Sequence, residues 1–599
     1  MTKQALRLTL ASLLLTSWSA ASPREIQPKP GADERPWRAA GLSDEQAASH
    51  LLDRFAFGAK PGDVERVSAL GPLVWLERQI EGVADPEELT RALQSDPINA
   101  MSATEIAEAY PPPGQMLRQL QSEGKMTADH YAALQKARSG EEADSEMLRE
   151  ARQMLRSAGF KPRRRLDGLL AAQKVVRAVH SENQLHEVLV DFWFNHFNVS
   201  LSDNEARVYV LPYERDAIRP HVLGDFRDLL GATAKHPAML LYLDNARSRA
   251  EEGQRTAMPQ RRGARGAGGR RAGARTMSSG RSAPPQLAAL RPTGLNENYA
   301  RELLELHTLG VDGGYTQDDI VAVARAFTGW TVLPPASARR GRMPTSSQAQ
   351  RLGFVVDDGF FFHPGFHDAE SKTILGQRFR GGRGMEEGER VLDLLVAHPS
   401  TARFLSHKLA VRFVADEPPS SLVDSLAEVF QKTDGNLAAV LRALARSPAF
   451  WSPEALRSKI KSPLEVAASS LRALDAKVQR PDGIVSWIER MGQPLYRYEA
   501  PTGFPDRSET WVNSGALLVR MNFGLELARG EVNGVRLPQS LRQPPTADTP
   551  AEMLEAVALQ LLPGRDASSV TEPLDGLLAE ADLTKAVGLV LGSPEFQRR

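Results

Sequence analysis

Apolar residues recur every three or four positions through most of this chain, and this spacing constrains the fold more than any other feature of the sequence. The stretch 63–82 is typical, with apolar side chains at Val64, Val67, Leu70, Leu73, Leu76 and Ile80. Such spacing places the apolar side chains on one face of an α-helix. With 599 residues and 42% hydrophobic content, the chain can bury a large core. We therefore expect a mainly α protein, an irregular multi-helix bundle with a small β-hairpin insertion and long loops.

The composition changes along the chain and predicts four parts. Residues 1–21 combine positive charge, an apolar stretch and small residues before a cleavage point, which is typical of a signal peptide. An N-terminal helical region at 22–160, a central helical domain at 161–415 and a C-terminal helical region at 416–599 follow. Within the central domain, residues 246–285 are rich in Arg, Gly, Ala and Ser, and this composition predicts a flexible insertion.

Charge and cysteine content exclude several classes of function. The 74 Lys and Arg residues balance 74 Asp and Glu residues, so we expect no nucleic-acid partner. No later apolar run reaches the roughly 20 residues that span a bilayer, so we expect no integral membrane segment after signal cleavage and a periplasmic or secreted location. The chain has no cysteine, so any metal would need His, Asp, Glu or neutral oxygen ligands.

The sequence from Asn296 to Gly310 predicts one short helix that carries a polar face. Asn296 can cap the first turn, and Gly310 can end the helix in the left-handed conformation. Asn298, Glu302 and Glu305 stand at i, i+4 and i+7 and therefore share one face. An apolar stripe lies beside them, so we expect a site at the edge of a core.

Two further segments contribute candidate polar groups. His196 continues the apolar stripe of a helix that ends in Phe-Trp-Phe-Asn-His-Phe, where a core histidine satisfied by one hydrogen bond is an equally good interpretation. Short apolar runs at 353–356 and 359–362 predict a hairpin, and His367 and Asp368 follow it on a loop. Loops often present chemical groups on a rigid scaffold.

These groups suggest a metal site in which His196, Glu302, Glu305, His367 and Asp368 converge. Imidazole and carboxylate ligands suit a divalent metal such as zinc, iron or manganese, which can activate water for hydrolysis. In this hypothesis Glu302 or Glu305 is the catalytic residue, acting as a ligand or as the base. We expect the substrate to be bound by Asn195, Asn298, Arg301 and Trp330.

Two other interpretations fit the same residues. In the first, they form a buried polar network in which Arg301 pairs with Glu302 or Glu305, because buried polar side chains need partners whether or not they catalyse a reaction. In the second, two carboxylates act as a metal-free acid and base, as in a glycosidase. The sequence has no Gly-x-Ser-x-Gly elbow or phosphate-binding loop, so a serine hydrolase and a nucleotide-binding protein are disfavoured.

Taken in order, these motifs resemble the large bacterial family catalogued as domain of unknown function 1800. The resemblance covers nearly all of the mature chain and rests on residues 192–197, 237–245 and 296–310, Tyr315-Thr316-Gln317-Asp318-Asp319, Gly329-Trp330 and His367-Asp368. It implies an exported protein and, because such proteins are often encoded beside sulfatase-like proteins, a sulfatase-like envelope partner. His307 stands where similar proteins commonly have an aromatic residue, so it is a poor candidate for an essential ligand.

Together these observations lead to two expectations for function. The first is a metal-dependent hydrolase of the cell envelope that acts on a glycan or modified saccharide. The alternative is a non-catalytic helical scaffold, or a glycan-binding partner of a sulfatase-like protein.

Overall fold

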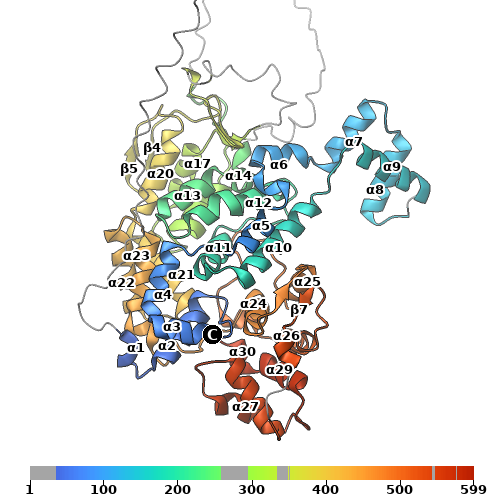
Figure 1. Cartoon of the computed structure of the whole chain (residues 1–599). Helices are drawn as coiled ribbons and strands as arrows, with labels where there is room; N and C mark the ends of the chain where they lie inside the picture. The colour runs from blue at the N-terminus through green and yellow to red at the C-terminus, as the bar shows by residue number, and fades with distance from the viewer. Residues whose placement is uncertain are drawn as a thin grey trace, which may run out of the picture.

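The structure is a computed structural model that describes residues 35–142, 144–257, 294–333, 349, 351–542, 547–574 and 576–599. Helices dominate the described chain and the strands are few and short, so the prediction of a mainly α fold is confirmed (Figure 1). No described helix has the length and apolarity needed to cross a bilayer. The predicted signal peptide lies outside the described residues.

The first N-terminal helices pack against helices from the second half of the chain, and the later ones contact the central helices. The N-terminal helices are α1 (Pro36–Ala39), α2 (Asp44–Phe55), α3 (Asp63–Leu70), α4 (Pro72–Glu81), α5 (Glu87–Gln94), η1 (Pro97–Ala100) and α6 (Ala103–Ala109). Helix α2 begins with a capping box formed by the Ser43 side chain and Gln46. At the other end of α2, Phe55 stacks on Phe413 with ring centroids 4.8 Å apart.

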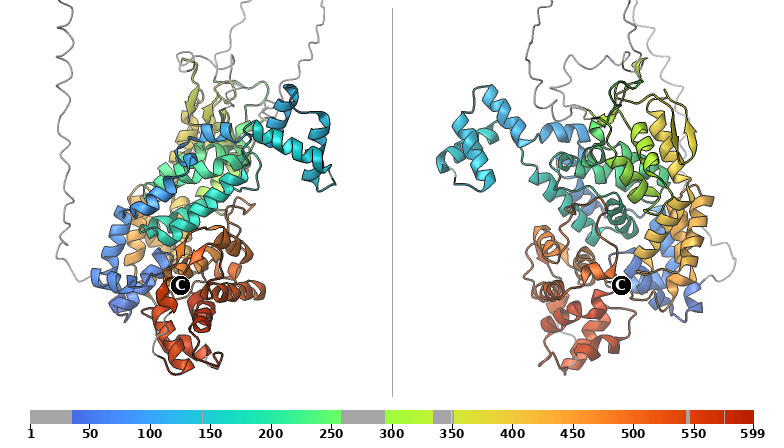
Figure 2. Two further views of the ribbon diagram at one scale, coloured as in Figure 1. Left: turned by 45° about the vertical axis from the view of Figure 1, so that its right-hand side comes forward. Right: turned by 180° about the vertical axis from the view of Figure 1, so that it is seen from behind.

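Three helices form an arm that projects from the body of the molecule, as both views in Figure 2 show. They are α7 (Pro113–Ser122), α8 (Ala128–Ser139) and α9 (Ser145–Ser157). The arm has a small apolar core of its own, made by Leu117, Leu120, Met126, Ala151 and Leu155. The dense charge that surrounds these apolar positions in the sequence lies on the surface of the arm.

The central helices hold the segments singled out in the sequence. They are α10 (Arg164–His180), α11 (Gln184–His196), η2 (Ala206–Tyr209), α12 (Val210–Pro212), η3 (Tyr213–Ile218), η4 (Arg219–His221), α13 (Phe226–Lys235), α14 (Pro237–Tyr242), η5 (Asn245–Arg247), α16 (Asn298–Glu302), η6 (Leu303–Thr308), α17 (Gln317–Ala326), α20 (Glu386–Val396) and α21 (Pro399–Phe413). Most of their apolar side chains join one continuous core with the N-terminal helices.

The helix predicted from Asn296 to Gly310 is more complex than expected. Asn296 caps its first turn by accepting from the amide of Asn298, and Gly310 has a φ of 83°, as predicted. Between these ends the α-helix α16 changes into a π-helix, η6, in which the Thr308 hydroxyl donates to the Leu303 carbonyl at 2.6 Å. A π-helix widens the turn, so the regular α-helical face expected for Glu302 and Glu305 is altered at η6.

The predicted hairpin is confirmed and gains a third strand. Strands β2 (Val355–Asp357) and β3 (Phe360–Phe362) are joined by a two-residue turn that ends in Gly359, and β1 (Trp330–Val332) pairs with the other edge of β3. The other short pairs are β4 (Lys372–Ile374) with β5 (Gln377–Phe379) and β6 (Lys477–Val478) with β7 (Val535–Arg536).

The first part of the predicted flexible insertion is held in place. Ser248 forms a β-bridge with Gly294, and Thr256 forms a second bridge with Asp368. Residues 246–257 therefore belong to the ordered body. The rest of the predicted insertion, residues 258–285, lies outside the described residues.

The C-terminal helices complete the body, and the last of them lie at the end opposite β4 and β5 (Figure 1). They are α22 (Ser420–Lys432), α23 (Leu437–Arg446), η7 (Pro448–Trp451), α24 (Pro463–Ala473), α25 (Asp482–Arg490), η8 (Ser508–Trp511), α26 (Ser514–Ala528), η9 (Gln539–Arg542), α27 (Pro550–Leu561), α28 (Ala567–Thr571), η10 (Glu572–Leu574), α29 (Leu583–Gly592) and α30 (Pro594–Gln597). An irregular segment, residues 491–507, returns from this region to the central helices, where it meets α11.

Candidate functional site

His196 is a buried core histidine at the end of α11. Its Nε2 donates to the main-chain carbonyl of His307 at 3.2 Å, and its ring lies edge-on to Trp193 and Phe197. Burial holds the pKa of His196 well below its usual range, and the charge of Lys408 lowers it further. This is the structural alternative considered for His196, a histidine satisfied by one hydrogen bond.

Glu302 and Glu305 lie half-buried at the junction of α16 and η6. Burial raises the pKa of Glu302, and the nearby charge of Glu305 adds to that effect. Tyr315 donates its hydroxyl to Glu305 at 3.3 Å. Arg301 donates to Gln317 at 2.9 Å and lies 3.5 Å from Glu297, and its charge partly offsets the raised pKa of Glu302. The ion pair predicted between Arg301 and Glu302 or Glu305 is therefore replaced by these two contacts.

His367 and Asp368 belong to a buried group of side chains that we call the closed cluster: Arg325, His367, Asp368, Lys372 and Glu387. Arg325 donates to Asp368 at 2.6 Å, and Lys372 donates to Glu387 at 2.6 Å and to the Asp368 carbonyl at 2.7 Å. His367 is held by the Thr328 carbonyl, 2.9 Å from its Nδ1. Each charged group of the cluster therefore has a partner of opposite charge.

The expected metal site is not formed in the part of the chain that the structure describes. No group of three or more His, Asp or Glu side chains there could hold a metal ion. His196 lies in an aromatic core, Glu302 and Glu305 form a separate half-buried pair, and His367 and Asp368 are enclosed in the closed cluster. His196 bonds to a main-chain carbonyl of η6, Glu305 accepts from Tyr315, and Asp368 is held by Arg325, so these groups are occupied by other partners and do not converge on one site.

The residues expected to bind substrate are also dispersed. Asn298 is exposed on α16, and Arg301 is occupied as described above. Trp330 is fully buried, with its ring against Phe327 and Phe360. Of this set, Asn195 alone lines the pocket described next.

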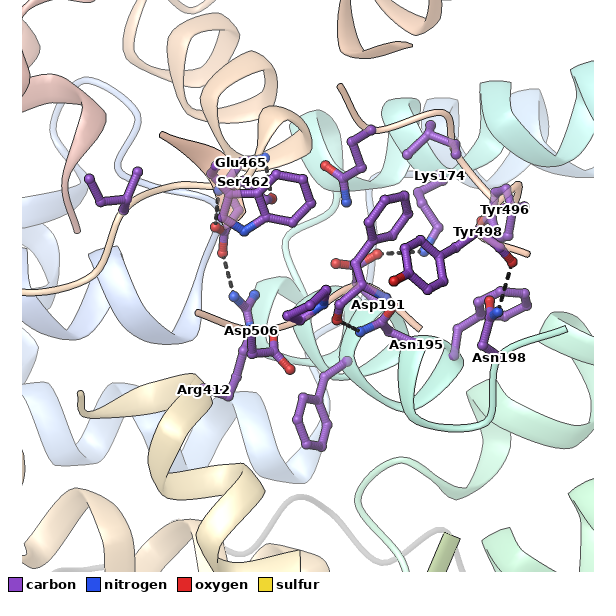
Figure 3. A pocket seen from close by; sticks show the side chains of 18 of the residues that line it. Lys174, Asp191, Asn195, Asn198, Arg412, Ser462, Glu465, Tyr496, Tyr498 and Asp506 are labelled. Carbon is purple, nitrogen blue, oxygen red and sulfur yellow. Dashed lines mark hydrogen bonds and ion pairs between the residues drawn. The ribbon is translucent and has the colours of Figure 1, made fainter. Parts of the chain in front are cut away.

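A pocket opens where α10, α11 and α21 meet α24 and the irregular segment before α26 (Figure 3). We call it the polar pocket. Its lining residues are Lys174, Asp191, Phe192, Phe194, Asn195, Asn198, Arg412, Ile460, Ser462, Glu465, Gln493, Leu495, Tyr496, Tyr498, Phe504, Pro505, Asp506, Trp511 and Arg599. In Figure 3, Arg412, Glu465 and Asp506 gather on one side, and Lys174 and Tyr496 on the other.

The last turn of α11 holds the irregular segment over the pocket. Asn195 makes two hydrogen bonds to Phe504, donating to its carbonyl at 2.6 Å and accepting from its amide at 2.7 Å. Asn198 donates to the carbonyls of Tyr498 and Ala500, at 3.0 and 2.7 Å. Gly503 has a φ of 67°, and a Cβ there would lie 2.1 Å from the Asn195 carbonyl oxygen, so only glycine fits.

One side of the polar pocket is a paired charge group around Lys174. Its Nζ lies 2.9 Å from Asp191 and 3.5 Å from Glu214, and Tyr496 donates its hydroxyl to Glu214 at 2.6 Å. Burial alone would lower the pKa of Lys174, but the charges of Asp191 and Glu214 outweigh it and raise the pKa. Lys174 therefore stays charged at neutral pH.

The other side of the polar pocket is built around Glu465 on α24. Its carboxylate caps the helix by accepting from the Ser462 amide at 2.8 Å, and it also lies 2.7 Å from Arg412 and 3.2 Å from Arg599. Burial alone would raise the pKa of Glu465, but Arg412 and Arg599 outweigh burial and lower it to about 2. Arg412 Nε and Nη2 are buried and have no hydrogen-bond partner among the described residues.

Three aromatic rings, two on the irregular segment and one at the end of η8, follow one another beside these charges. Tyr498 and Phe504 have ring centroids 4.5 Å apart, and Phe504 and Trp511 have centroids 5.5 Å apart. The centres of water-sized molecules can occupy about 50 Å³ of the pocket. That is room for roughly four water molecules, so the pocket can enclose one small group and not a whole sugar ring.

Most of these residues stand in sequence patterns that do not indicate a site. Lys174, Asp191 and Arg412 lie on amphipathic helices, where charged residues usually face solvent. The sequence signals in this region are Ser462-Pro463-Leu464-Glu465, which is typical of a helix start, and Gly503-Phe504-Pro505, and neither by itself indicates a site. Only the fold shows that they meet α11.

The fold and the pocket define a mainly α-helical protein with a single continuous main core and a polar pocket lined by aromatic rings. The family model described as "Protein of unknown function (DUF1800)" matches residues 50–598, and the chain belongs to this family. The resemblance drawn from the sequence motifs is thereby confirmed. No curated protein and no solved structure matches the chain.

Proposed function

We propose that this chain is an exported protein that binds a saccharide of the cell envelope in the polar pocket. The observation that carries the proposal is the row of rings formed by Tyr498, Phe504 and Trp511. Side chains that can donate or accept hydrogen bonds lie beside this row. Aromatic faces pack against the apolar faces of sugars, and carboxylates and amides bind hydroxyl groups. A site of this kind combines an apolar surface with a few fixed polar groups.

The size of the pocket indicates how a saccharide would lie. Because the cavity takes only one small group, a ligand would insert one substituent and place its ring over the aromatic row. Asp191 and Asp506 line the pocket and are available to accept hydroxyl hydrogens. The Asn195 and Asn198 side chains support this arrangement indirectly, because they fix the backbone that carries Tyr498 and Phe504.

Binding is favoured over metal-dependent hydrolysis because of where the expected ligands lie. The expected metal ligands lie in three separate places: the aromatic core, the pair on α16 and η6, and the closed cluster. The aromatic rings and polar side chains that suit a saccharide lie together in the polar pocket. A sulfatase-like partner stays a prediction from the family resemblance.

Calorimetric titration of the mature protein with a panel of neutral and acidic envelope saccharides tests this proposal. At least one saccharide should bind, and Trp511→Ala should weaken it tenfold or more by removing part of the aromatic row. Trp511→Phe, which keeps a ring, should retain most of the affinity. Tyr131→Ala in α8 of the arm is the matched control and should bind like the wild type. Absence of binding across the panel, or equal affinity of the folded Trp511→Ala variant, would overturn the proposal.

A further inference from the structure

The guanidinium of Arg412 is incompletely paired. Only its Nη1 reaches a carboxylate, that of Glu465 at 2.7 Å, while Nε and Nη2 have no acceptor among the described residues. The whole residue is 4% exposed and forms part of the pocket wall. A buried donor without an acceptor costs about 1–3 kcal/mol, and a charged donor costs more. An acceptor supplied by a ligand would remove this cost.

The two unpartnered nitrogens define the chemistry of that acceptor. Nε and Nη2 lie on one edge of the planar guanidinium, and this edge matches two oxygens of a carboxylate, phosphate or sulfate. Both atoms are covered in the structure, so the guanidinium has to turn about its last side-chain torsions to meet a group in the adjoining cavity. A cavity of about 50 Å³ suits one such oxyanion.

The charges nearby favour one anionic group and oppose several. Arg599 also lines the pocket, and it shares Glu465 with Arg412. Two more buried arginines on this side, Arg54 and Arg520, have unpartnered guanidinium nitrogens in the described chain. The carboxylates of Asp191 and Asp506 carry the opposite charge, and they are close enough to Arg412 to raise its pKa. A polyanion would meet both carboxylates, whereas a polyol with a single oxyanion would offer them hydroxyl groups.

We propose that the Arg412 side of the polar pocket is a subsite for one oxyanion, carried by a ligand whose remaining groups are mostly hydroxyls. The subsite stands on the geometry of Arg412 alone; its assignment to a saccharide rests on the proposed function. The same chemistry can come from a free inorganic anion or from a substituted sugar, and the two sources are separated by experiment.

The first arm titrates the full-length mature protein with sodium sulfate, phosphate and acetate at constant ionic strength. Saturable binding to the wild type should fall at least tenfold in Arg412→Met. Arg403→Met, on the same helix but exposed, is the matched control and should bind like the wild type. Asp506→Asn removes a carboxylate that repels the anion, and it should tighten binding several-fold. This gain provides a test even if Arg412→Met does not fold.

The second arm compares glucose with glucuronate, glucose 6-sulfate and glucose 6-phosphate. An acidic sugar should bind at least tenfold more tightly than glucose, and Arg412→Met should abolish the difference. If free anions bind and no sugar does, the subsite is retained and the saccharide proposal fails. If neutral and acidic sugars bind equally and free anions do not compete, the saccharide proposal stands and the oxyanion subsite is overturned.

Discussion

The closed cluster and the polar pocket contain the same kinds of charged residue but differ in how completely those residues are paired. In the closed cluster, Lys372 is completely enclosed and shares its charge with Glu387 and Asp368. In the polar pocket, Arg412 is nearly as well buried, yet two of its nitrogens have no partner within the described chain and a cavity adjoins it. The contrast teaches that residue type alone does not distinguish the two regions. They differ in that the unpaired donors of Arg412 adjoin a cavity, which is why we propose binding there.

The largest expected effect comes from breaking the closed cluster. Lys372→Met leaves Glu387 and Asp368 buried with fewer positive partners, and removal of one member of a buried ion pair costs about 3–5 kcal/mol. Chemical denaturation should show a loss of unfolding free energy in that range. Ligand binding at the polar pocket should be unchanged in the protein that remains folded.

Lys432→Met provides the control for this substitution. Lys432 is exposed on α22 and pairs with the exposed Glu428, so its loss should change stability by less than about 0.5 kcal/mol. If Lys372→Met were as mild as Lys432→Met, the closed cluster would not be a source of stability, and the contrast with the polar pocket would fail.

A smaller effect is expected from Glu465 in the polar pocket. Its pKa in the folded protein is about 2, below the value of an unfolded glutamate, so it adds stability above about pH 4.5 that is lost as the pH falls toward 2. Glu465→Gln should cost about 2–3 kcal/mol at neutral pH and flatten the decline of stability in that acid range. Thermal denaturation from pH 6 downward measures both changes. An unchanged acid decline would contradict the assignment.

Asn195 tests how the irregular segment is held over the pocket. Asn195→Ala removes two hydrogen bonds to Phe504, which should cost about 1–2 kcal/mol and speed hydrogen exchange of the Phe504 amide. Asn298→Ala, at an exposed position on α16, should leave that exchange rate unchanged. Equal exchange of the Phe504 amide in wild type and Asn195→Ala would show that other contacts hold the segment.

Local patterns in the sequence were enough to predict the helical fold and some of its details. The capping residue Asn296, the left-handed Gly310 and the hairpin before His367 all depend on neighbours within a few positions. The π-helix at η6 was missed because its apolar spacing resembles that of an α-helix. The role of Arg301 was missed because Gln317 is reached only through the fold.

The polar pocket could not be predicted because its parts come from distant segments. Asn195 bonds to Phe504 across a separation of 309 residues, and neither residue carries a sign of the other. The five-residue metal hypothesis failed for the same physical reason: chemical suitability says nothing about distance when the intervening chain is long. Asn195 was predicted to bind substrate; it lines the polar pocket, where its side chain bonds to the backbone of Phe504, and a substrate contact stays a prediction.

The smallest expected effect comes from Lys461, a buried lysine beside the cation-rich side of the polar pocket. Burial lowers its pKa to about 7, with its Nζ 4.0 Å from the centre of the Phe596 ring. Above pH 7 the unfolded chain holds this proton more tightly than the folded protein, so stability should rise with pH, by about 1 kcal/mol between pH 7 and pH 8. Lys459, with a pKa lowered to about 8, should extend the rise at higher pH.

Lys461→Met should remove the rise of stability below pH 8, and the exposed Lys432→Met should keep it. If the rise of stability with pH persisted in Lys461→Met, Lys461 would not be its source. The polar pocket would then have one buried cation fewer beside it than its comparison with the closed cluster assumes.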